Sequence, residues 1–109
     1  MTTRMKRDRE SGHRMRLLRH WAVGNHQGSQ SEFSNRVGLT AKQWNHFERG
    51  FPVPRDVAIA LVLAFSGLTT DWILMGRDGG LTVRLKHELN EAEKTLPAPR
   101  PPRQRVSSS

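Results

Sequence analysis

The chain has 109 residues, of which 35% are hydrophobic, and it carries no cysteine and a formal net charge of +8 at pH 7. This length accommodates one small domain, and the lack of cysteine excludes disulfide bonds and thiolate chemistry. The basic start lacks the apolar segment of a signal peptide, and the longest apolar run, residues 57–65, is far too short to cross a bilayer. We therefore expect a soluble, cytoplasmic domain with no membrane contact, whose positive charge favours a polyanionic partner.

Most of the positive charge lies at the two ends of the chain. Residues 1–20 carry seven Arg/Lys against two Asp/Glu, and residues 97–109 add three arginines. Residues 21–76 and 77–96 each sum to zero, so the overall charge does not by itself direct the polyanion to the middle. We expect residues 1–10 to be a flexible basic arm and residues 97–109 to be a disordered, Pro-rich basic tail. The basic residues of the arm are Arg4, Lys6, Arg7 and Arg9. The arm either contacts phosphates or a minor groove through these residues, or it acts only as a solubilising tail.

The first helix is expected from about Ser11, a candidate cap, to about Val23. It has one apolar stripe at helical spacing, which consists of Met15, Leu18 and Ala22. The next five residues, GNHQG, have the composition of a loop.

Residues 29–50 predict two short helices joined by a glycine turn. Ser29 is a candidate cap of the first of them, with Glu32 completing a capping box. Thr40 and Gln43 form the same pattern at the start of the second. Helix, glycine turn and helix within 22 residues is the pattern of a helix-turn-helix.

Apolar spacing indicates the buried faces of this pair. Phe33 and Val37 are four residues apart, and Trp44 and Phe47 are three apart, so each pair shares one helix face. The second helix, at about residues 41–49, therefore directs its polar residues outward.

Two further helices are expected to complete the domain. Residues 55–66 are apolar nearly all round, which predicts the central buried helix. Thr69 or Thr70 can cap a short fifth helix. The apolar residues of that helix, expected to close the core, are Trp72, Ile73 and Met75. No alternating pattern typical of strands occurs, so the predicted fold class is all-α.

An additional C-terminal helix is expected within residues 77–96. Its apolar stripe consists of Leu81, Leu85, Leu89, Ala92 and Leu96. The stripe fits either packing against the chain's own core or the seam of a homodimer, and the spacing does not choose between them.

Several short pieces of residues 29–76 occur in one order at a characteristic spacing. They are Ser29-Gln30, Gly38-Leu39-Thr40, Glu48-Arg49-Gly50, Pro54 and the stretch from Leu68 to Gly76. In these pieces the chain resembles the phage repressor and Cro-like helix-turn-helix family, the XRE-type regulators. The resemblance implies a five-helix, lambda-repressor-like domain over residues 11–76. In such a domain helix 3, here at about residues 41–49, docks in the major groove of operator DNA, usually as part of a dimer. Ser34 is a departure, because the family usually has alanine at that position.

The outward residues of helix 3 are the candidate base readers. Lys42 can donate to guanine, His46 can donate or accept, and Asn45 can do both at adenine. Gln43 lies at the border of the face, and Ala41 offers only a methyl contact to thymine. By family position Lys42 and His46 come first, followed by Asn45 and Gln43. The alternative for the whole set is an ordinary solvated polar face.

Contacts to the DNA backbone are expected from helix starts and from the end of helix 3. Free N–H groups at a helix N-terminus attract a phosphate, which favours Ser29 and Gln30, and Arg49 adds a cation. Arg55 stands at another helix start, and the resemblance implies a phosphate contact there too. The alternatives are an ordinary exposed first-turn residue for Gln30 and a surface arginine paired with Asp56 for Arg55. The resemblance also implies an internal ion pair between Glu48 and a helix 1 arginine, either Arg16 or Arg19.

Enzymatic and metal-dependent functions lack any supporting motif. The chain has no phosphate-binding glycine loop, nucleophile elbow or HExxH, and its histidines lack metal-ligand spacing. We therefore expect no enzyme activity, no cofactor, no metal and no small-molecule effector domain. The expected function is a sequence-specific transcriptional regulator, most simply a homodimeric repressor on double-stranded DNA. The alternative is an antitoxin or adaptor that uses the same helices to bind a protein.

Overall fold

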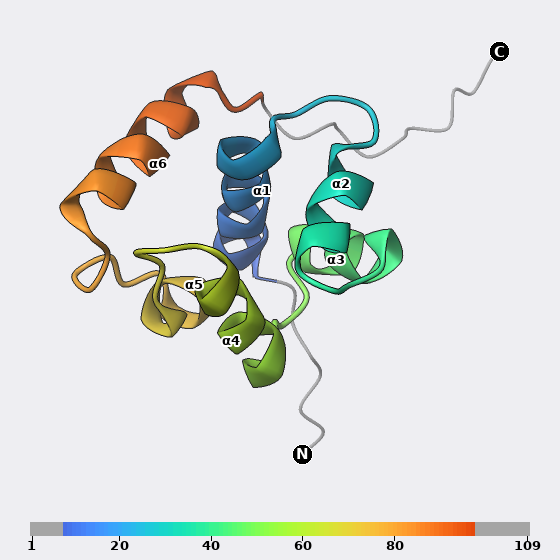
Figure 1. The fold of residues 1–109 in the computed structure, drawn as a ribbon, viewed down its shortest axis with the longest axis horizontal. Coiled ribbons are helices and arrows are strands. Elements are labelled where there is room, and N and C mark those ends of the chain that lie inside the picture. Colours follow the sequence, from blue (N-terminus) through green and yellow to red (C-terminus); the bar gives the residue numbers. More distant parts are fainter. Residues whose placement is uncertain (1–7, 98–109) are drawn as a thin grey trace, which may run out of the picture.

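The computed structural model describes residues 8–97, and these residues form six helices and no strand (Figure 1). The helices are α1 (Arg9–Val23), α2 (Ser29–Arg36), α3 (Ala41–Glu48), α4 (Arg55–Ala64), α5 (Thr70–Met75) and α6 (Val83–Thr95). The predicted all-α class is therefore confirmed. α1 is the central element, because α2, α3, α5 and α6 all pack against it.

The start of α1 differs from the prediction by two residues. The carboxylate of Asp8 caps the helix by accepting the N–H groups of Glu10 and Ser11, so Ser11 lies inside the helix and is buried. Asp8, Arg9 and Glu10, which the sequence pattern assigns to the arm, therefore belong to the capped start of α1. Arg9 is exposed in the first turn, whereas residues 1–7 and 98–109 lie outside the described part of the chain.

α1 and α3 approach each other closely where α3 ends. The backbone N–H of Asp8 donates to the carbonyl of Gly50 at 2.8 Å. A Cβ atom at Gly12 would lie 2.7 Å from the carbonyl oxygen of Glu48, and one at Gly50 would lie 2.7 Å from that of Asp8. Gly50 also has a φ of +97°, which side chains rarely adopt. These glycines therefore allow the beginning of α1 to lie directly against the end of α3.

The predicted capping box at Ser29 is wrong, whereas the one at Thr40 is confirmed. Gly28, in the left-handed conformation, precedes α2 and provides no side-chain cap, and Ser29 is only 2% exposed. Its hydroxyl instead accepts a hydrogen bond from Arg19 on α1. At α3, Thr40 accepts from the N–H of Gln43, while the Gln43 side chain accepts from the N–H of Thr40.

α4 is not the central buried helix that its apolar sequence predicts. Only Val57, Ala58 and Leu61 are buried, while Ile59 is 44% and Leu63 83% exposed. The reason is geometric, because α1 occupies the centre and α4 packs mainly on α5 through one face. Met75 is likewise exposed, since the short α5 buries only Trp72 and Ile73.

α6 extends along α1 on the side away from α2 and α3 (Figure 1). Leu81, Leu85 and Leu89 are buried in the common core, and Ala92 and Leu96 pack against it. Of the two interpretations of this stripe, the structure has the intramolecular one, so the stripe is not an open seam for a second copy. No helix in residues 8–97 is long and apolar enough to cross a membrane.

Candidate nucleic-acid interface

α3 is anchored by two buried aromatic residues and presents a polar face to solvent. Trp44 and Phe47 are buried as predicted, and the Trp44 ring lies 4.4 Å from that of Phe33 on α2. Because these rings fix the inward side of α3, the opposite side faces outward. Its exposed residues are Lys42, Gln43, Asn45, His46 and Arg49, while Ala41 is half-buried.

Beneath this face lies a buried ion pair between α1 and α3. Nε and Nη2 of Arg19 donate to the two carboxylate oxygens of Glu48 at 2.5 and 2.9 Å. The indole N–H of Trp44 also donates to Glu48. Nη1 of Arg19 reaches the loop before α2, where it donates to Asn25 and Ser29. The expected ion pair of Glu48 is therefore present, with Arg19 as its partner and not Arg16.

Burial of Glu48 changes the charge that α3 shows to a partner. Glu48 is the only acid on α3, and it is neutralised by Arg19 below the surface. The exposed face therefore carries Lys42 and Arg49 without a carboxylate of its own helix. The net charge of zero for residues 21–76 does not reveal this, because that sum sets Glu48 against cations that it does not contact.

Two candidate residues from different helices meet at the edge of this face. Nε2 of Gln30, in the first turn of α2, donates to Oδ1 of Asn45 at 3.2 Å and to Oε1 of Glu48 at 3.2 Å. Ser29, expected beside Gln30 as a backbone contact, is instead buried with its hydroxyl bound to Arg19. Its side chain is therefore not available to a phosphate.

Phe51 was not among the candidates, yet it organises the end of α3. Its ring stacks on that of His46 with a centroid distance of 3.8 Å and an interplanar angle of 6°. The guanidinium of Arg49 lies 5.7 Å from the same ring. The sequence signal for this role is an aromatic residue directly after Gly50. The residue also precedes Pro52, so the pattern alone groups it with the loop.

The remaining candidates occupy less direct positions. The side-chain oxygen of Gln43 is engaged by Thr40 in the capping box, which leaves its amide N–H₂ group for a partner. Arg55 is exposed at the first residue of α4, and residues 49–54 separate it from α3. The hydroxyl of Ser34, the departure from the family pattern, donates to the carbonyl of Ser31 and so has its partner within α2.

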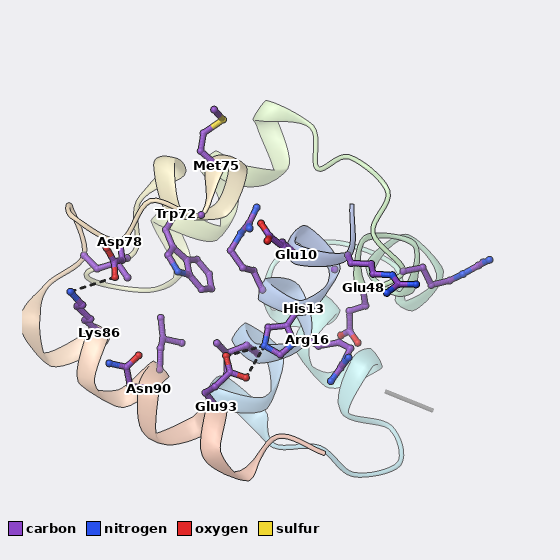
Figure 2. Close-up of a pocket in the computed structure, with 18 residues that line it drawn as sticks. Glu10, His13, Arg16, Glu48, Trp72, Met75, Asp78, Lys86, Asn90 and Glu93 are labelled. Atoms are coloured by element: carbon purple, nitrogen blue, oxygen red, sulfur yellow. Dashed lines mark hydrogen bonds and ion pairs between the residues drawn. The ribbon is translucent and has the colours of Figure 1, made fainter. Parts of the chain in front are cut away.

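A groove of the described surface lies between α1, α5 and α6, and Glu48 and Arg49 at the end of α3 also line it (Figure 2). It has a volume of about 1210 Å³ and contains charges of both signs. His13 pairs with Glu93 at 2.7 Å, and Lys86 lies 3.4 Å from Asp78. In residues 8–97 no group of three or more His, Cys, Asp or Glu residues could hold a metal ion. The groove therefore lacks a converging set of one charge, unlike the α3 face.

Comparison with known proteins gives no assignment. No protein-family model matches this chain, and neither a curated protein nor a solved structure matches it.

Proposed function

We propose that this protein is a sequence-specific DNA-binding transcriptional regulator, most simply a repressor, that inserts α3 into the major groove. The observation that carries the proposal is the outward face of α3. It combines two exposed cations with the amides and imidazole of Gln43, Asn45 and His46, while the only acid of the helix is buried. Such donors and acceptors on an exposed helix are what base-edge recognition requires.

The helix pair also fits the geometry of the helix-turn-helix family that the sequence resembles. α2 and α3 are short, are joined by four residues, and pack on one another through Phe33 and Trp44. Exposed Arg49 and Arg55 supply candidate phosphate contacts.

Selection of sequences from a random duplex library tests the proposal. The full chain should be used at near-physiological salt with excess non-specific DNA, because its basic ends bind any duplex at low salt. We expect one short motif to be enriched, and failure to enrich any motif would rule the proposal out. A chain shortened to begin at residue 11 is unsuitable, because it lacks the cap formed by Asp8.

A homodimer on a palindromic site belongs to the same proposal. The enriched motif should then contain two half-sites with centres about one helical turn, roughly 10–10.5 base pairs, apart. Because the α6 stripe is buried, the dimer would have to use another surface, and the exposed Ile59 and Leu63 of α4 are available. Sedimentation of the full chain measures the oligomeric state directly.

The second candidate function is an antitoxin or adaptor that binds a protein. The exposed Ile59 and Leu63 favour it, since exposed aliphatic residues on one helix face are common in protein interfaces. Library selection, carried out with the unmodified chain and with both residues replaced by serine, distinguishes the candidates. The enriched motif should persist on half-site DNA if α3 is the reader, whereas an adaptor enriches no motif with or without the change.

A further inference from the structure

The carboxylate of Glu48 imposes a direction on the hydrogen bonds around it. Each of its oxygens accepts two donors, from Arg19 and Trp44 on one oxygen and from Arg19 and Gln30 on the other. An ionised carboxylate can only accept. Gln30 must therefore turn its N–H₂ group, and not its carbonyl oxygen, toward Glu48.

This direction passes on to Asn45. The same N–H₂ group of Gln30 also donates to Oδ1 of Asn45, so its nitrogen has two acceptors within the protein, Asn45 and Glu48. Since the Asn45 oxygen is engaged by Gln30, the opposite end of its amide, Nδ2, is left for the exposed face. A free asparagine could turn either end toward a base, but this one is held.

From this arrangement we infer that Asn45 reads DNA as a hydrogen-bond donor and selects guanine, with Gln30 and Glu48 as positioning residues. Guanine offers two adjacent acceptors in the major groove, O6 and N7, whereas cytosine offers only a donor. Adenine is the usual partner of an asparagine that can turn freely, because the asparagine oxygen then accepts from the N6 amino group of adenine. In this protein that oxygen is turned toward Gln30. The inference rests on the proposed function and adds to it the identity of one DNA base that the protein recognises.

The Asn45→Asp variant is the sharpest test. Aspartate still accepts from Gln30 through one oxygen, but it presents an acceptor to the DNA where Asn45 presents a donor. Library selection with the full chain should therefore show one position at which G·C, preferred roughly tenfold in the unmodified protein, changes to C·G. An unchanged base preference at every position would overturn the inference while leaving the proposed function intact. Failure of the unmodified chain to enrich any motif would overturn both.

Gln30→Ala tests the positioning role without touching the ion pair. Arg19, Glu48 and Trp44 keep their mutual contacts, so the fold should be retained, and thermal unfolding checks this. Asn45 can then turn freely, and adenine should become acceptable at the guanine position, with the tenfold preference falling below about twofold. A purely structural or phosphate-binding Gln30 would instead lower affinity for all sequences equally. Gln27→Ala, at an exposed glutamine of the preceding loop, is the matched control and should leave the preference unchanged.

A measurement without DNA checks the orientation itself. In the NMR spectrum of the free protein, the side-chain N–H₂ protons of Gln30 should exchange with water more slowly than those of Asn45, because within residues 8–97 only the former donate hydrogen bonds. The reverse order of exchange would show that Asn45 is the donor of the pair and would overturn the inference.

Discussion

On one side of α1, the α2–α3 pair is held by buried charged and polar groups, whereas on the other side α6 is held by leucines with polar contacts at the rim. Arg19 and Glu48 are both buried and bidentate, and their hydrogen bonds extend to Trp44, Ser29 and the loop before α2. On the α6 side, His13–Glu93 and His20–Thr95 are exposed, and Leu85 and Leu89 make the buried contact.

The two sides therefore differ in what they specify. Apolar contacts stabilise without a fixed direction, and leucines can adjust to small shifts of a helix. A buried network of hydrogen bonds fixes the rotation and position of the helices that it joins, because a shift leaves a buried group unpaired. The proposed reading face lies on the side that is directionally fixed.

The largest expected effect is the loss of the buried acid. Glu48→Ala leaves the guanidinium of Arg19 buried without its partner, which should lower the free energy of unfolding by about 3–5 kcal/mol. Glu93→Ala removes an exposed acid from the other side of α1 and should cost no more than about 1 kcal/mol. Urea unfolding of both variants measures the contrast. Equal losses would show that the two sides do not differ as described.

Next in size is the apolar contact of α6. Leu89→Ala should lower the free energy of unfolding by about 2–4 kcal/mol, because it opens a cavity between α6 and α1. Val83, also on α6, is almost fully exposed, so Val83→Ala should change stability by at most about 0.5 kcal/mol. If Leu89→Ala proved as mild as Val83→Ala, α6 would not be part of the core in solution.

The reading face should affect binding and not stability. Lys42→Ala and His46→Ala should each weaken binding to the selected sequence by about 1–3 kcal/mol and relax the preference at one base step. Lys86→Ala removes the same charge from the α6 side, where the lysine lies 3.4 Å from Asp78, and should have little effect. Fluorescence anisotropy with selected and scrambled duplexes measures both. An equal loss on the scrambled duplex would mean that these residues contact only the backbone.

The comparison also explains how far the sequence could predict this molecule. The helices, the inward Trp44 and Phe47, and the capping box at Thr40 follow from local spacing, and all three are present. The central helix was misassigned because hydrophobicity shows that α4 is apolar, not which helix occupies the middle. That depends on long-range packing, in which α1 is surrounded although four of its residues are Arg.

The candidate face was predictable only residue by residue. The spacing of apolar residues on α3 predicts which of its side chains face outward. It does not show that Gln30 on α2 reaches Asn45 on α3, or that Phe51 stacks on His46. Ser29 was misassigned because a serine at a helix start usually caps it, whereas this hydroxyl binds Arg19 from α1. Such contacts join residues distant in sequence, so no local pattern records them.

The smallest expected effect tests whether the polar rim near α6 is formed in solution. The pKa of Glu88 is lowered from its ordinary value of 4.5, first because the indole N–H of Trp21 donates to it and then because Arg84 does. Trp21→Phe keeps a ring beside Phe65 but removes the indole donor, so the pKa of Glu88 should rise toward 4.5. Arg84→Ala removes the weaker cause and should raise it less. Carboxyl-carbon NMR titration of Glu88 measures both shifts.

The sign of the accompanying pH dependence follows from linkage. A carboxyl whose pKa is lowered by folding stabilises the fold above its ordinary pKa, and this contribution is lost as the pH falls through the folded value. The difference in urea midpoint between the unmodified chain and Trp21→Phe should therefore be largest above pH 4.5 and should shrink below it. The loss of ring packing is independent of pH and remains as a constant offset. If the pKa of Glu88 stayed the same in Trp21→Phe, the contact between Trp21 and Glu88 would be absent in solution, and α6 would be held by its leucines and by the remaining rim contacts, His13–Glu93 and His20–Thr95.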